Sequence, residues 1–207
     1  MNRDAPVMQD SKTSLLEAAL RVIRAKGYSA SSVDDICREA GLTKGSFFHH
    51  FKSKEELALA AAGYFATRAD ALFAKAPYRT LEDPLDRLLG YVDFRKAILT
   101  GSLSEFTCLL GTMVQETFET HPAIRDACDQ HISAHAAEIA KDAAEAKRRY
   151  APKARWSAQS LGLHVQAVIQ GAFILAKAKN GARIAGECLD HLGRYLDMLF
   201  DRPRAKE

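Results

Sequence analysis

The stretch from Ser31 to Lys54, SSVDDICREAGLTKGSFFHHFKSK, decides the fold of the N-terminal part of the chain. Its apolar residues recur at i, i+3, i+4 and i+7, which is the spacing of one buried helix face: Val33, Ile36, Cys37 and Ala40. A turn and then basic and aromatic residues, from Lys44 onward, follow the end of this pattern. The stretch therefore predicts a short amphipathic helix followed closely by a second one.

The ends of these two helices can also be predicted. Ser32 is placed to cap the first helix, and acidic residues occupy its first turn. Gly41 can adopt the left-handed conformation that ends a helix, and Thr43 can cap a second helix from Lys44 to Phe51. Two short helices joined by such a tight turn predict a helix-turn-helix, whose second helix enters the major groove of DNA.

The run GLTKGSFFHHFKSKEEL, preceded by SSVDDICREAG, resembles the N-terminal domain of TetR-type transcriptional repressors over about Ser11 to Leu57. Phe48 departs from the family pattern, because Tyr is usual at this position and its hydroxyl can contact a phosphate. The resemblance implies an all-helical regulator that binds a palindromic operator as a dimer and is released by a small molecule.

The predicted second helix has two distinct faces. On a 3.6-residue period Phe47 and Phe51 face the small core, whereas Gly45 and His49 face the opposite way. Gly45 lets the backbone approach DNA, and helix starts supply groups that bind phosphate. These arguments and the resemblance give ten candidate DNA contacts: Ser31, Ser32, Thr43, Lys44, Gly45, Ser46, Phe48, His49, His50 and Lys54. For each of them the alternative is an exposed side chain without an energetic role.

Composition agrees with a soluble regulator. The chain has 207 residues, 47% of them hydrophobic and 27% charged, and a net charge of only +3. Residues 12–54 hold eight Lys and Arg against four Asp and Glu, so the positive charge is concentrated in the predicted DNA-binding part. The four cysteines are far apart, which is typical of reduced thiols in a cytoplasmic protein. No uninterrupted apolar run approaches the roughly 18 residues of a membrane span, so we expect no membrane partner.

The rest of the chain carries helical patterns broken at prolines and glycines. We expect helices over residues 11–26, 53–76, 84–99, 104–119, 123–150, 156–179 and 184–200. No alternating strand pattern competes with them. The sequence therefore predicts an all-α protein with a DNA-binding unit over residues 1–54 and a larger helical effector-binding and dimerisation unit over residues 55–207.

The last two predicted helices indicate a homodimer. The first contains small residues among larger apolar ones, and the second contains a row of leucines: Gly162, Ala167, Gly171 and Ala178, then Leu189, Leu192, Leu196 and Leu199. Small residues let helices approach closely, and apolar faces need partners. The alternative is packing within the chain, but a two-fold operator requires two DNA-binding units.

Aromatic and other apolar residues of the middle helices are candidates for an effector site: Phe94, Phe106, Cys108, Leu110, Met113, Phe118 and Phe173. The alternative is an ordinary helical core. No cluster of basic residues in this segment indicates an anionic effector.

Cys108 offers a second sensing chemistry. It falls near the start of a predicted helix, where thiols become reactive, so it could sense electrophiles or oxidants. The alternative is a small buried apolar residue.

The sequence gives little support for a metal site, a cofactor or an enzymatic activity. Cys128, His131 and His135 share one predicted helix face, and Cys188 and His191 repeat part of that spacing, but no further ligand completes a site. A polar face is the simpler interpretation, so we expect no metal and no cofactor.

The chain has no HExxH, GxSxG, phosphate-binding loop or dinucleotide fingerprint, and we expect no enzyme. A ligand-independent architectural DNA binder stays as an alternative, although it would not need so large a helical unit.

Overall fold

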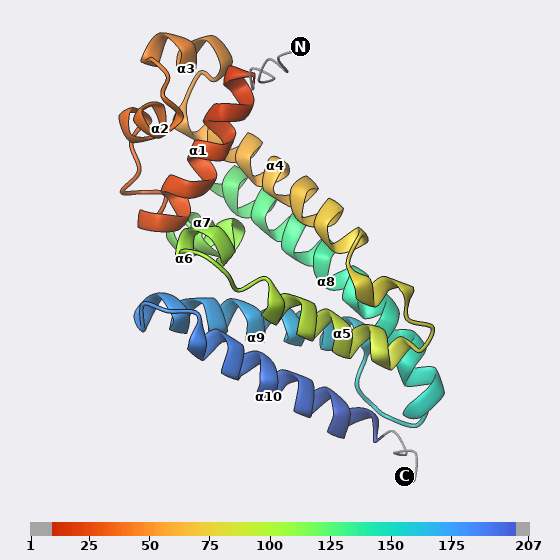
Figure 1. Ribbon diagram of the computed structural model, residues 1–207. Coiled ribbons are helices and arrows are strands. Elements are labelled where there is room, and N and C mark those ends of the chain that lie inside the picture. The colour runs from red at the N-terminus through yellow and green to blue at the C-terminus, as the bar shows by residue number, and fades with distance from the viewer. Residues whose placement is uncertain (1–9, 202–207) are drawn as a thin grey trace, which may run out of the picture.

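The computed structural model of the chain describes residues 10–201 (Figure 1). Within this range ten α-helices and one short 3-10 helix follow one another and no strand forms, which confirms the predicted all-α class. The helices are α1 (Ser11–Lys26), α2 (Val33–Ala40), α3 (Lys44–His50), α4 (Lys54–Ala74), η1 (Pro77–Thr80), α5 (Pro84–Ala97), α6 (Leu103–Phe106), α7 (Leu109–Thr117), α8 (Pro122–Tyr150), α9 (Ala158–Ala178) and α10 (Arg183–Phe200). Residues 1–9, which begin the predicted DNA-binding unit, lie outside the described range.

Helices α1 to α3 form a headpiece whose helix ends lie where the sequence predicts them. Ser32 and Asp35 form a reciprocal capping box, in which the Asp35 amide donates to Ser32 Oγ at 3.1 Å and the Ser32 amide donates to Asp35 Oδ2 at 2.9 Å. Gly41 ends α2 at a left-handed φ of 66°. Thr43 Oγ1 accepts from the Ser46 amide at 3.2 Å and begins α3. These local hydrogen bonds fix the turn between the two motif helices.

Helix α4 connects the headpiece to the rest of the molecule. Figure 1 shows α2 and α3 at one end of an elongated molecule, with α4 leaving them and running beside α8. Leu57 and Ala61 of α4 are buried in the same apolar cluster as Leu15 of α1, Phe47 of α3 and Met113 of α7. The headpiece core is therefore continuous with the neighbouring ends of α7 and α8. A movement of α7 would change the packing of the headpiece core.

The prediction of a single helix over residues 104–119 is wrong, because the structure has two helices there, α6 and α7, with a break at Thr107 and Cys108. Both residues are extended, with ψ of 159° and 125°. Arg24 Nη1 of α1 donates to the carbonyls of Glu105 at 3.0 Å and Thr107 at 3.3 Å, which satisfies groups that the break leaves unpaired. This stabilising contact comes from a residue 81 positions away in the chain, so local sequence could not reveal it.

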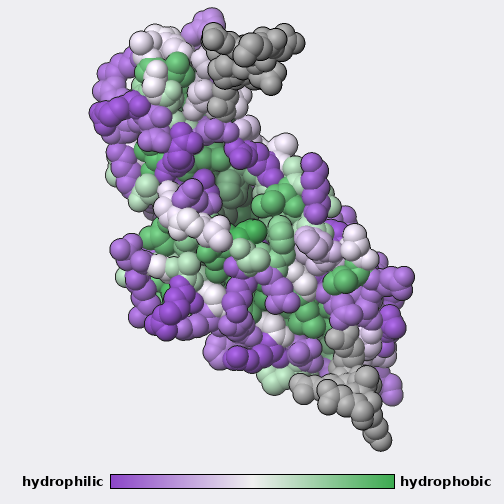
Figure 2. All heavy atoms as spheres, in the orientation of Figure 1, coloured by the Kyte–Doolittle hydropathy of each residue, from purple (hydrophilic) through white to green (hydrophobic). Residues whose placement is uncertain are grey.

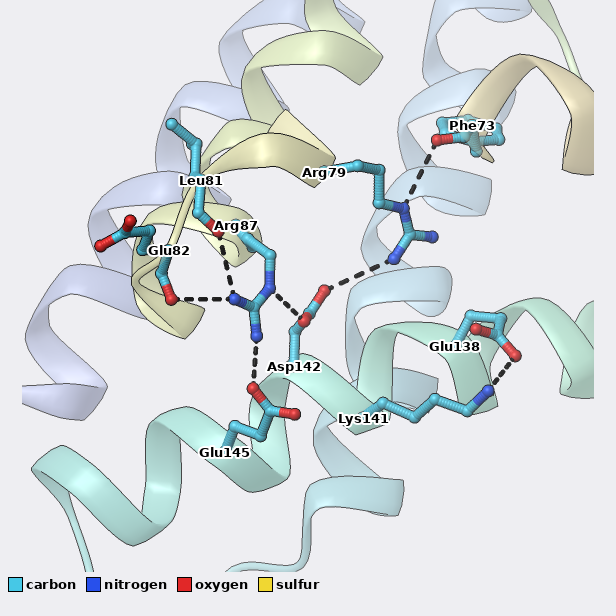
Figure 3. A network of polar contacts seen from close by, with 9 residues as sticks. All are labelled: Phe73, Arg79, Leu81, Glu82, Arg87, Glu138, Lys141, Asp142 and Glu145. Atoms are coloured by element: carbon cyan, nitrogen blue, oxygen red, sulfur yellow. Dashed lines mark hydrogen bonds and ion pairs between the residues drawn. The ribbon is translucent and has the colours of Figure 1, made fainter. Parts of the chain in front are cut away.

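Helices α5, α8, α9 and α10 pack around a second apolar cluster. A side chain at Gly162 of α9 would lie 2.4 Å from the carbonyl oxygen of Ala136 of α8, so these two helices approach closely. Figure 3 shows how α5 is tied to α8: Arg87 Nε donates to Asp142 Oδ1 at 2.6 Å, and the same guanidinium also reaches Glu145. Arg79 adds a longer contact to Asp142 at 3.7 Å.

Helix α9 is long and apolar enough to cross a membrane when only length and composition are considered. In the structure it packs between α8 and α10, and 44% of its most apolar window is buried there. Packing within the protein thus accounts for part of its apolar character, and the exposed remainder requires another explanation.

Candidate functional site

Helix α3 presents an open face to solvent. Phe47 is fully buried, whereas Gly45 and His49 are exposed and Phe48 is 57% exposed, which confirms the predicted helix faces. A Cβ added to Gly45 would meet only Thr43 Oγ1, at 3.6 Å. The packing of the chain would therefore tolerate a side chain at position 45. Because Gly45 has none, the backbone of α3 is accessible to a large partner.

Lys44 is exposed at the start of α3 and pairs with Asp34 of α2 at 2.8 Å. The hydrogen bond to Asp34 raises the pKa of Lys44. Exposed ion pairs of this kind contribute little free energy. Lys44 is therefore charged and can exchange the carboxylate for a phosphate or a guanine edge.

The two histidines of α3 differ in their surroundings. His49 is exposed, while His50 is half-buried with its Nε2 2.6 Å from Ser11 Oγ. The rings of His49 and His50 lie edge to face, with centroids 4.8 Å apart. His50 thus connects α3 to the start of α1, and His49 is the better placed of the two for an external partner.

Two of the expected phosphate contacts face inward instead. Ser31 is only 2% exposed and its hydroxyl donates to the carbonyl of Gly27 at 2.5 Å. Lys54 Nζ donates to the carbonyls of Tyr28 at 3.1 Å and Ser31 at 3.0 Å, and burial lowers the pKa of Lys54. In the structure both side chains therefore hold the loop between α1 and α2, and their contact with phosphate stays a prediction. The hydroxyls of Ser32 and Thr43 serve as helix caps, and Ser46 is half-buried beside Thr43.

A void of about 70 Å³ lies inside the helical body. Four of the expected effector residues line it, namely Phe106, Cys108, Leu110 and Phe173. The other three lie elsewhere: Phe94 packs against the rings of Phe73 and Tyr78, Met113 is fully buried in the headpiece cluster, and Phe118 is exposed at the end of α7. The sequence found the segment that lines the void but not which residues of it face inward.

A groove of about 600 Å³ opens beside this void, between α1, α4, α5 and α6. Figure 2 shows the hollow on this face, with hydrophobic residues at its floor and hydrophilic residues around it. Groove and void share Phe65, Phe73, Phe106 and Arg95. Four arginines line the groove: Arg21, Arg24, Arg68 and Arg95. The middle segment, in which the sequence shows no basic cluster, contributes only Arg95; α1 and α4 bring the other three arginines to the groove from outside that segment.

One wall of the void carries a polar network. Tyr91 Oη lies 3.0 Å from His135 Nε2, and Gln166 Nε2 donates to Tyr91 Oη at 3.3 Å. Burial lowers the pKa of His135 to about 4, so this ring is neutral at pH 7. The network gives the void hydrogen-bonding groups that are not themselves charged.

The residues considered for metal binding have different surroundings. Cys128 is buried in the headpiece cluster, where burial raises the pKa of its thiol to about 12, whereas His131 lines the void and His135 belongs to the polar network. Over residues 10–201 no three His, Cys, Asp or Glu side chains gather as a metal site would require.

Cys108 lies at the start of α7 and faces the void. Its Sγ accepts from the Gly111 amide at 3.5 Å, and its side chain is half-buried. It also lines a second hollow beside the void, which includes Lys177 and Glu116.

Helix α7 joins the void to the headpiece, a connection that the sequence did not predict. At its other end Glu116 accepts from the amides of Tyr28 at 3.2 Å and Ser29 at 2.8 Å. Gly27 lies directly over this carboxylate at a positive φ of 89°, and a Cβ there would be 2.2 Å from Glu116 Oε1. The void and the loop that precedes the helix-turn-helix are thus attached to the two ends of one short helix.

The last two helices leave an apolar surface exposed. It consists of Leu163, Ile174, Leu175, Tyr195 and Met198. Gly171 of α9 adjoins open space, with nothing within 4 Å of an added Cβ, so another helix has room to approach. In contrast, Gly162 packs against α8, and Leu189, Leu192 and Leu196 are buried within the chain. These residues therefore pack within the chain and are not available to a second subunit.

A capped helix-turn-helix with an open recognition helix, mounted on an all-helical body, defines a helix-turn-helix transcriptional regulator. Residues 15–61 match the family model of the bacterial regulatory proteins of the tetR family, and residues 84–184 match that of the C-terminal domain of LmrA/YxaF-like transcriptional regulators. The chain belongs to the TetR family of bacterial transcriptional regulators.

Individual relatives resemble parts of the chain or its whole fold. It is 38% identical over 58 residues to the uncharacterized HTH-type transcriptional regulator YerO of Bacillus subtilis, covering 28% of this chain and 20% of YerO. It is 38% identical over 94 residues to the HTH-type transcriptional repressor KstR2 of Mycobacterium tuberculosis, covering 44% of each chain. The chain thus matches less than half the length of these two regulators. A TetR transcriptional regulator of Chloroflexus aurantiacus has the same fold, with a TM-score of 0.79 at 25% identity over 91% of this chain and 94% of that one.

Proposed function

We propose that the protein is a repressor that binds a palindromic operator as a homodimer and releases it when a small molecule binds the helical body. In this proposal residues 1–54 bind DNA in the cytoplasm, and residues 55–207 bind the effector and the second subunit. The observation that carries the proposal is the outward face of α3. Thr43 caps this helix, and Gly45, Phe48 and His49 on its outward face are exposed to solvent. The likeness to the repressor KstR2 supports repression.

The exposed apolar surface of α9 and α10 supports the homodimer. Monomeric proteins rarely expose so many large apolar residues together on one pair of helices. A two-fold dimer buries this surface and presents two copies of α3 to successive major grooves, about one helical turn apart.

Release by an effector requires a ligand that binds the DNA-incompetent arrangement more tightly than the competent one. A hundredfold loss of operator affinity needs about 2.7 kcal/mol of coupling. Helix α4 spans headpiece and body, and α7 connects the void to the loop at Gly27. A ligand in the void that shifts either helix would change the spacing of the two recognition helices.

Fluorescence anisotropy with DNA from upstream of the coding region tests the DNA-binding site. Lys44→Ala should weaken binding by about 1–3 kcal/mol if Lys44 contacts a base. If it contacts a phosphate instead, the substitution should flatten the salt dependence by about one counterion. Lys75→Ala, an exposed lysine at the end of α4, is the control and should leave both quantities unchanged. Unchanged affinity and salt dependence in folded Lys44→Ala protein would remove Lys44 from the site.

A thiol sensor is the second candidate function. It rests on the position of Cys108, which begins α7 and faces the void, so a group added to its sulfur would occupy the proposed effector site. Alkylation with N-ethylmaleimide should then release operator DNA from the wild type but not from Cys108→Ser. Equal release from both proteins would exclude Cys108 as the sensor.

A further inference from the structure

Arg95 lies where the void and the groove adjoin, since it lines both. Its guanidinium lies between two aromatic rings, with its central carbon 5.2 Å from the centroid of Phe73 and 5.4 Å from that of Phe173. Cation–π contacts with both rings hold the guanidinium at this position and leave its N–H groups without a carboxylate partner in the described part of the chain. Arg95 is therefore a donor held in place beside an apolar void.

The other arginines of the groove already have partners. Arg21 pairs with Glu39 at 2.6 Å and Arg68 pairs with Glu17 at 2.8 Å. Arg24 donates to three backbone carbonyls on α1 and around α6. Within residues 10–201, by contrast, no carboxylate lies within 4.0 Å of the Arg95 guanidinium.

Two further carboxylates face this region and do not neutralise Arg95 directly. Glu105 lines the groove, but its carboxylate accepts from the Ser102 amide at 2.6 Å and caps α6. Asp70 lines the void and makes no ion pair with Arg95. The forked donor edge of Arg95 is therefore the group at this point that can bind an external carboxylate in a bidentate manner.

The other residues that line the void indicate the chemistry of the rest of the ligand. Phe65, Phe106, Phe173 and Ile132 supply apolar walls, and the neutral Gln166 and Gln170 supply hydrogen-bonding groups. A void of about 70 Å³ is smaller than the roughly 150 Å³ cavity that holds a benzene molecule. A ligand of ordinary size must therefore extend from the void into the groove, and it passes Arg95 as it does so.

We propose that the effector of this protein is an amphipathic organic acid, whose carboxylate binds Arg95 and whose slender apolar body fills the void and the floor of the groove. This inference rests on the proposed effector site and names the chemical class of its ligand. Arg95 acts as the specificity-determining residue, because a neutral or cationic analogue of the same shape leaves its donors unpaired or repelled.

Isothermal titration calorimetry on the full-length protein without DNA tests this inference with two matched series. The first is octanoate, octanamide and octylamine; the second is 3-phenylpropionate, 3-phenylpropanamide and 3-phenylpropylamine. In at least one series the acid should bind at least about tenfold more tightly than the amide, and the amine more weakly than the amide. Arg95→Gln should abolish the preference for the acid over the amide. Arg95→Lys, which keeps the charge but not the fork, should retain only part of it.

Arg21→Gln is the control, because it removes the same charge from the same groove while breaking only an exposed ion pair. It should keep the preference for the acid. The inference is overturned if acid and amide bind equally, if the amine binds best, if no member of either series binds, or if folded Arg95→Gln retains the preference. Operator binding is measured separately, so a protein that binds acids through Arg95 but binds no operator would refute the proposed function and leave this inference standing.

Discussion

Gly45 is the residue at which the demands of folding and of DNA binding separate most clearly. Helix interiors generally disfavour glycine by about 0.5–1 kcal/mol relative to alanine, and nothing in the chain crowds this position. A residue that weakens α3 without serving the packing is expected where a partner must approach the backbone. Ser31 and Lys54 show the opposite case, since their polar side chains hold the headpiece together.

Gly45→Leu should therefore leave the thermal midpoint of unfolding equal to or above that of the wild type, while operator affinity falls at least about tenfold, or about 1.4 kcal/mol. The reason is that the added Cβ makes only an ordinary van der Waals contact, with Thr43 Oγ1, in the free protein, but the side chain would meet DNA in the proposed complex. Gly63→Leu is the control, because Gly63 of α4 adjoins open space, away from α3. Calorimetry and anisotropy measure the two effects. Full affinity in Gly45→Leu would show that DNA does not approach α3 at this point.

At the scale of secondary-structure elements, α7 connects the void, which we propose as the effector site, to the headpiece. Its first residues line the void, and its last turn carries the Glu116 carboxylate that receives two amides of the α1–α2 loop. Because both amides bind one side chain, a displacement of α7 is passed directly to the loop that precedes α2.

Glu116→Ala should increase the hydrogen-exchange rates of the Tyr28 and Ser29 amides by about tenfold or more, because both lose their acceptor. Exchange in the core of α1 should not change. Glu119→Ala removes an exposed carboxylate from the neighbouring turn and serves as the control. Protection of both amides that survives in Glu116→Ala would argue against α7 as the connection.

The attachment of α5 to α8 gives a prediction about stability. Arg87 and Asp142 are both mostly buried, and the hydrogen bond to Asp142 raises the pKa of Arg87. Asp142→Ala should therefore lower the free energy of unfolding by about 3 kcal/mol, since it leaves a buried guanidinium with one partner fewer. Glu138→Ala breaks the exposed pair with Lys141 on the same helix (Figure 3) and should cost less than about 1 kcal/mol. Equal midpoints in urea for the two variants would contradict this account.

The elements that the sequence predicted correctly are those defined by local hydrogen bonds. Ser32, Gly41 and Thr43 each end or begin a helix through groups within four residues, so their signals can be recognised in the sequence. The break at Thr107 and the position of Arg95 depend on helices far apart in the chain. Arg24 satisfies the carbonyls of the break, and Phe73 and Phe173 hold Arg95. No local pattern marks such contacts, and for this reason the sequence predicted only some of the residues that line the void.

At the scale of the whole molecule, α9 and α10, which carry the exposed apolar residues, lie on the opposite side of the molecule from α2 and α3 (Figure 1). In the proposed dimer, a two-fold axis through this apolar surface would keep both recognition helices free for DNA. The distance between the two helices then depends on the orientation of each headpiece relative to its own helical body, which is the quantity that α4 and α7 can alter.

Leu163→Glu should convert the dimer to a monomer at micromolar concentration, because it places a charge in an apolar interface. Leu72→Glu is the matched control: Leu72 of α4 is 47% exposed, against 52% for Leu163, but lies outside α9 and α10. Light scattering after gel filtration measures both masses. A wild-type mass equal to one chain, or a dimeric Leu163→Glu, would contradict the assignment of this surface.

The central claim is that two copies of α3 recognise DNA symmetrically. Selection of bound duplexes from a random-sequence library by the full-length protein, followed by sequencing, tests it most directly. We predict enrichment of an inverted repeat whose half-sites have centres about one helical turn or slightly more apart. Enrichment of a single half-site without symmetry, or of no sequence at all, would contradict the claim.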